Sequence, residues 1–195
     1  GHTMLVEMHD HGVYRLLGET IDDAAGEAFN KVARFLGLGY PGGPAVEREA
    51  AAGNPEAIAF PRAMLNDSLD FSFSGLKTSV MNYVRKHPDV SSSDVAASFQ
   101  AAVVDVLVAK ARRAAVQVGA KGLVLGGGVA ANSQLREQFL EGCVVDGIRG
   151  FLPSRSMCTD NAAMIAAAGW YRLRRDGPTP LDVGAYPNLR LPFIL

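Results

Sequence analysis

The 195-residue chain has 19 lysines and arginines, 20 aspartates and glutamates, and 48% hydrophobic residues. This composition predicts a globular protein with one substantial core, or two subdomains, and the balanced charge argues against strong binding of nucleic acid by the chain alone. The two cysteines, Cys143 and Cys158, suit neither a disulfide framework nor a metal spacing, so we expect a reducing, cytoplasmic setting. Because no apolar run reaches membrane length, no membrane partner is expected.

The chain opens with a predicted β-hairpin. Residues 4–8 and 13–17 have the pattern of strands, and residues 10–12 form a glycine-containing turn between them. We interpret the nearby His9 and His11 as solvated turn residues, because two histidines at a turn make a poor metal site. Since the strand pattern starts at once, we expect the sequence to be part of a longer chain.

The next predicted element is a helix at residues 23–36, with Asp22 or Asp23 as its N-cap. Glu27 and Asn30 lie one turn apart on its polar face, which a solvated surface would explain equally well.

A loop of prolines and glycines, residues 40–44, follows the helix and leads into a short helix with Pro44 at its first position. Gly43 allows a ligand to approach the backbone closely, or it serves only the turn. Glu47 lies on the first turns of the short helix.

The middle of the chain predicts two further helices, one ending near residue 86 and a long one at residues 94–118. The prolines around them indicate an insertion or a small subdomain. We interpret Lys110, Arg112 and Arg113 as the solvated end of the long helix, where cations suit the helix dipole.

The most informative stretch is a strand, a glycine turn and a helix in succession. Residues 123–125 form a short apolar run, three glycines follow, and a helical pattern opens at residues 129–132. This layout suits a nucleotide, because glycines admit a ligand and a helix start offers free N–H groups. Asn132 can both donate and accept hydrogen bonds, as a base or ribose requires. The alternative is a turn that merely lets a helix pack on a sheet.

The last part of the chain predicts a short strand at residues 149–152 and a helix at residues 162–171, capped by Thr159 or Asp160. The alanines of this helix favour close packing on a neighbouring element, with a partner surface as the alternative. From Gly177 onward we expect an extended tail.

Four motifs in register, GETIDDAAGEAFNKVARFLGLGYPGGP, SFSGLKT, LVLGGGVAANSQLR and CTDNAAMIA, resemble the TsaD family of tRNA N6-adenosine threonylcarbamoyltransferases, formerly called glycoproteases. The resemblance implies an α/β fold of the actin/Hsp70/sugar-kinase (ASKHA) type, here without its N-terminal lobe. It divides the chain into a nucleotide-binding core at about residues 1–22 and 119–176, a helical insertion at about 23–118, and the extended tail, 177–195.

The resemblance also implies an acyltransferase. Such enzymes move a threonylcarbamoyl group from threonylcarbamoyl-adenylate to N6 of the adenosine beside the anticodon, in tRNAs that read codons starting with A. Expected partners are tRNA, the adenylate or ATP, the paralogue TsaB and the ATPase TsaE. No Ser-His-Asp or Cys-His nucleophile is visible, which agrees with direct attack by the tRNA amine. We expect the chain by itself to be inactive.

Site residues follow from the resemblance, motif by motif. The adenylate site would contain Gly1, Asn30, Gly43, Glu47, Gly127, Gly128 and Asn132. One divalent metal, Fe²⁺ or Zn²⁺, would be held by Asp160 and by two histidines of the absent lobe. Since one carboxylate holds a cation poorly, we expect weak or no metal binding by this chain.

Asn30 departs from the family pattern, which has Asp at this position for the ribose hydroxyls. Because charged acceptors make stronger hydrogen bonds, we expect weaker ribose binding, by about 1 kcal/mol.

Three other functions remain open from the sequence. A metallopeptidase would need a motif such as H-E-x-x-H, which does not occur here. A non-catalytic nucleotide-binding scaffold and, less well, a sugar kinase also fit parts of the pattern. The transferase hypothesis requires that the turns at Gly43, Gly128 and Asp160 converge on one cleft.

Overall fold

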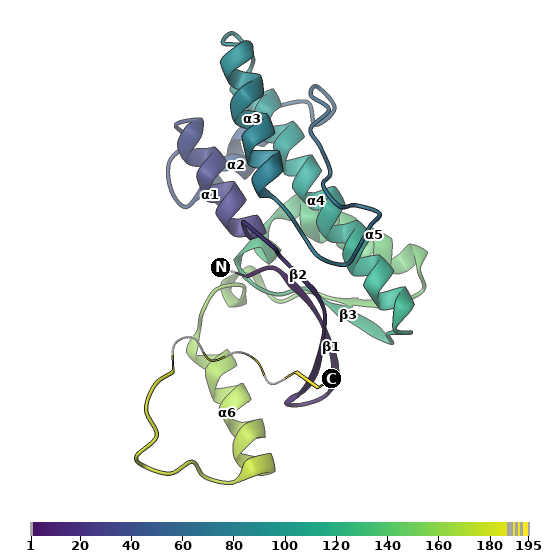
Figure 1. Cartoon of the computed structure of the whole chain (residues 1–195), viewed down its shortest axis with the longest axis vertical. Helices are drawn as coiled ribbons and strands as arrows, with labels where there is room; N and C mark the ends of the chain where they lie inside the picture. The colour runs from purple at the N-terminus through teal and green to yellow at the C-terminus, as the bar shows by residue number, and fades with distance from the viewer. Residues whose placement is uncertain (1, 187–188, 190, 192, 195) are drawn as a thin grey trace.

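A computed structural model describes residues 2–186, 189, 191, 193 and 194. Its elements form a helical body, a hairpin that extends from this body, and a last helix that lies apart from it (Figure 1). Gly1 and parts of the predicted tail lie outside the described residues. The predicted α/β class is confirmed, with two small sheets beside the helices.

The helical body holds the main hydrophobic core. Its first four helices are α1 (Ala25–Phe35), α2 (Gly42–Ala50), α3 (Ser74–Lys86) and α4 (Ser92–Gln117). Phe29 and Phe99 meet edge to face at its centre, 5.2 Å between ring centroids. The helices predicted in this region are confirmed, although α2 begins before Pro44, because Asn30 caps its N-terminus at Gly42.

Helix α4 crosses the molecule and is apolar on nearly all sides. It has the length and hydropathy of a membrane span, but 67% of its most apolar window is buried inside the protein. Sixteen of its residues are buried, among them Phe99 and Lys110. These values are those of the core helix of a folded domain.

The hairpin consists of β1 (Met4–Asp10) and β2 (Val13–Glu19), which pair antiparallel as predicted. Gly18 of β2 packs so closely on the backbone of the following loop that a Cβ there would lie 2.3 Å from the carbonyl oxygen of Leu69. The predicted solvated histidines are exposed, but His11 is not free in solvent, because its ring stacks on Tyr171 of the last helix.

The second sheet has two short parallel strands, β3 (Gly122–Val124) and β4 (Arg149–Phe151). Between them the chain forms a 3-10 helix, η1 (Gly128–Ala131), and helix α5 (Ser133–Val145). The predicted strand, glycine turn and helix are therefore confirmed. A smaller core joins this unit to α4 through Val104, Leu135 and Phe139.

Two predicted caps are wrong. Asp22 does not cap α1; its carboxylate accepts hydrogen bonds from the N–H of Phe73 (2.9 Å) and the hydroxyl of Ser74 (2.5 Å), so it caps α3. Asp23 instead pairs with Lys31 and Lys77. Capping from a distant segment leaves no local pattern in the sequence.

The interpretation of Lys110 as part of a solvated helix end is also wrong. Its side chain has no exposed surface, and its ammonium group donates to the carbonyl oxygens of Ser68 and Asp70. Burial lowers the pKa of Lys110. Arg113 binds the same loop through the carbonyl of Leu65, so α4 holds that loop by cations.

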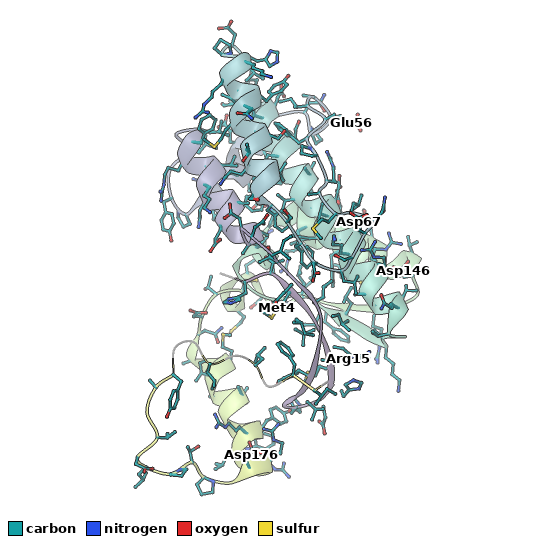
Figure 2. The ribbon with its side chains drawn as sticks, viewed as in Figure 1. Met4, Arg15, Glu56, Asp67, Asp146 and Asp176 are labelled. Carbon is teal, nitrogen blue, oxygen red and sulfur yellow. The ribbon has the colours of Figure 1, made fainter. Side chains whose placement is uncertain are left out.

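The last helix, α6 (Ala162–Asp176), extends five residues beyond the predicted end. None of its residues is buried, so the expected close packing of its alanines is wrong for this chain. Its far end, labelled Asp176 in Figure 2, lies beside the hairpin tip, where Arg175 donates to the carbonyl oxygen of His11.

Candidate functional site

A cleft of about 620 Å³ lies beyond the carboxyl ends of β3 and β4. One wall is the glycine turn, Gly126, Gly127 and Gly128. The other wall comprises the segment after β4, from Leu152 through Asp160. The carboxyl edge of parallel strands is where open α/β sheets bind ligands, because loops diverge there and helix N-termini face the opening. Gly128 and Asp160, two of the three turns expected to converge, therefore share one cleft.

The glycine turn presents bare backbone to the cleft. All three glycines are exposed, and a Cβ built on any of them would meet no atom within 4 Å. Gly127 has φ of 86°, a conformation that side chains disfavour. No packing requirement therefore explains why Gly126 and Gly128 lack side chains, whereas close approach of a ligand to the backbone does.

Asp160 stands on the opposite wall without an internal role. The cap of α6 is Asn161, whose Oδ1 accepts from the N–H of Met164 at 3.0 Å, so capping by Thr159 or Asp160 is wrong. Asp160 is exposed and makes no hydrogen bond or ion pair within the described part of the chain. Its carboxylate is available to a ligand or cation.

A metal site is not complete in this chain. Among residues 2–186, 189, 191, 193 and 194, no three His, Cys, Asp or Glu side chains lie close enough to hold a cation. Asp160 alone offers one carboxylate, which does not fit a stable site for iron or zinc.

Asn132 is buried at the start of α5 rather than displayed in the cleft. Its Oδ1 accepts from the N–H of Leu135 at 2.9 Å, and its Nδ2 donates to Oε1 of Gln100 at 2.7 Å. Gln100 in turn donates to Gln134. Both ends of the Asn132 amide are engaged, and the side chain fixes the helix that follows the glycine turn.

A second group of predicted residues lies on α1 and α2. Oδ1 of Asn30 accepts from the N–H of Gly42 at 2.9 Å, and Oε1 of Glu47 accepts from the N–H of Ser133 at 2.8 Å. Glu47 thereby joins α2 to the start of α5. Gly43 has open space at its Cβ position but does not line the cleft described above.

The structure adds residues that the sequence analysis did not select. Gly42 is needed for packing, since a Cβ there would lie 2.5 Å from Cα of Asn30. Arg136 donates to the carbonyl oxygens of Ala130 and Pro153, one on each side of the cleft. A signal was present, because a cation in the first turns of a helix opposes the helix dipole and so calls for a tertiary partner.

Comparisons with known proteins agree with this arrangement. The family model described as TsaD, tRNA N6-adenosine threonylcarbamoyltransferase, matches residues 1–167. Curated relatives with that name are 50% identical over 196 residues in Clostridium botulinum (strain Kyoto / Type A2), 54% over 196 in Moorella thermoacetica and 53% over 194 in Symbiobacterium thermophilum. Each alignment covers 98% of this chain but only 57–58% of the relative. The chain belongs to the TsaD family.

Proposed function

We propose that the protein to which this chain belongs transfers a threonylcarbamoyl group from threonylcarbamoyl-adenylate to N6 of the adenosine beside the anticodon, in tRNAs reading codons that begin with A. The observation that carries the proposal is the cleft itself. Gly127, Gly128 and Asp160 come from segments about thirty residues apart and line one opening at the ends of parallel strands. The names of the relatives support the reaction.

The chain's own residues supply binding and charge stabilisation. The exposed backbone of the glycine turn approaches the adenylate, and the N–H groups at the start of η1 face developing negative charge as AMP leaves. The tRNA amine attacks the carbonyl carbon of the threonylcarbamoyl group directly, so no enzyme nucleophile is needed. Because Asp160 alone does not complete a metal site, we derive no step through a metal.

The proposed enzyme is two-lobed and of the ASKHA type, with a further lobe that faces α6 and closes the cleft. The support is the surface of α6, where Ile165 is 68% exposed, Trp170 50% and Leu173 53%. An apolar surface of this kind marks an interface. The relatives have the necessary length, since the chain spans 58% of theirs. We place the enzyme in the cytoplasm, with TsaB and TsaE as its partners.

The test joins this chain to the remaining part of the Moorella thermoacetica relative and assays tRNA with ATP, threonine, bicarbonate and the adenylate-forming partner. We expect modified tRNA from the joined protein and none from the chain alone. Replacing Asp160 by Asn in the joined protein gives the matched control, and we expect it to lose activity while remaining folded.

Other outcomes identify other functions. Peptide cleavage without tRNA modification would favour the metallopeptidase, and nucleotide binding without transfer would favour a scaffold module. A joined protein that folds and binds its partners, yet leaves tRNA unmodified, would refute the proposed transfer.

A further inference from the structure

Two arginines connect the second wall of the cleft to α5. The guanidinium group of Arg136 donates from Nη1 to the carbonyl oxygen of Ala130 at 3.0 Å and from Nη2 to that of Pro153 at 2.9 Å. Arg155 donates from Nη2 to the hydroxyl of Ser133 at 2.8 Å. Ala130 belongs to the helical turn that follows the glycine turn, and Pro153 opens the segment that ends in Asp160.

The segment after β4 is a unit held mostly by its own hydrogen bonds. The N–H of Met157 donates to the carbonyl of Ser154 at 2.9 Å, and the N–H of Cys158 to that of Arg155 at 3.2 Å. The thiol of Cys158 also donates to the carbonyl of Ser154. A unit bonded internally moves as one body, so its few links to α5 decide where it stands.

Arg136 is the link that spans the opening. A planar guanidinium holds two acceptors at a fixed separation and angle, which the single ammonium of lysine does not. We propose that Arg136 is a positioning residue of the adenylate site, and that its guanidinium sets the gap between the glycine turn and the Asp160 wall. This inference rests on the proposed function only in naming the ligand.

The chain offers a matched control at the other end of α5. Arg112 of α4 also makes a two-pronged contact, to Asp146 at 2.7 and 2.6 Å, and both arginines are partly buried. Asp146 follows the C-terminal end of α5, far from the cleft (Figure 2). Changing either arginine to lysine removes the same chemistry, but only one change affects the cleft.

The two cysteines provide the measurement, because one lies at each place. Cys158 is buried in the wall of the cleft, and Cys143 is buried on α5, where burial raises the pKa of its thiol. We would follow alkylation of each by iodoacetamide, in this chain, with and without AMP. In Arg136→Lys we expect Cys158 to react about five-fold faster while Cys143 stays within about two-fold. The concentration of AMP that half-protects Cys158 should rise about five-fold.

The control variant Arg112→Lys should leave both values for Cys158 unchanged. Unaltered reactivity of Cys158 in Arg136→Lys, parallel acceleration of both cysteines, or an equal rise in half-protection in both variants would overturn the inference. If Arg136→Lys does not fold, Arg136→Gln is compared with Arg112→Gln in the same way. If AMP fails to protect Cys158 even in the unmodified chain, the nucleotide site is refuted, while alkylation alone still decides whether Arg136 sets the gap.

Discussion

Replacing Asn30 by Asp should stabilise this chain, because the side chain caps a helix that lacks a cap of its own. The residue before α2 is Pro41, which offers no side-chain acceptor, and Oδ1 of Asn30 takes that role at the N–H of Gly42. A carboxylate makes a hydrogen bond worth about 0.5–1.5 kcal/mol more than an amide does. The positive end of the helix dipole adds about 0.3–1 kcal/mol.

Neighbouring charges on α1 nearly cancel for the new carboxylate. Glu27 lies three residues before it and repels it, whereas Arg34 lies four residues after it and attracts it, each by about 0.2–0.5 kcal/mol. The net gain in the free energy of unfolding is therefore about 1 kcal/mol, or about 2–4 °C in Tm. Urea and thermal unfolding of Asn30→Asp measure it, with Asn82→Asp on exposed α3 as the control, expected within about 0.5 kcal/mol.

The pH dependence of this gain gives a second check. A carboxylate that accepts from the N–H of Gly42 has its pKa depressed on folding, so its stabilisation is present above the unfolded value, about 3.9, and is lost as pH falls through the folded value. A variant no more stable than the parent at pH 7, or a gain that survives below about pH 2, would refute the capping argument.

The remaining predictions concern four positions. Asn30→Asp in a complete enzyme should tighten adenylate binding about five-fold if the ribose also uses this side chain, and unchanged affinity would exclude that contact. Gly18→Ala should cost about 1–3 kcal/mol of stability by urea unfolding, because its Cβ would enter the carbonyl of the facing loop. The pKa of Asp22 lies below its ordinary value of 3.8, since hydrogen bonds from Ser72 and other groups at the start of α3 outweigh desolvation by burial; its stabilisation should be complete above pH 3.8 and disappear on further acidification, and Asp22→Asn should remove that acid-sensitive part. Asp160→Asn should change stability by less than about 0.5 kcal/mol, and a larger loss would show an internal role.

Local patterns identified most of the elements. The hairpin follows from alternating residues around a glycine turn, and the β3 to α5 unit follows from an apolar run, three glycines and a helical repeat. These signals are local because the hydrogen bonds that they describe join neighbouring residues. They placed Gly127, Gly128 and Asp160 on turns, and the structure adds that these turns face one cleft.

Contacts between distant segments could not be read in the same way. Asp22 caps a helix fifty residues further on, and Lys110 has its acceptors about forty residues earlier in the chain, so neither partner is marked by spacing. The exposure of α6 had a similar cause. Its alanines fit close packing, but packing needs a neighbour, and among the described residues α6 meets chiefly the hairpin tip.

Adjacent residues at the start of α6 divide two duties between them. Asn161 secures the helix, which leaves the carboxylate before it uncommitted. A mutation at position 161 is therefore expected to act through folding, whereas one at 160 is expected to act through chemistry alone. This separation means that the ligand preference of the cleft can be retuned at a single side chain, by selection or by design, without weakening the scaffold that carries it.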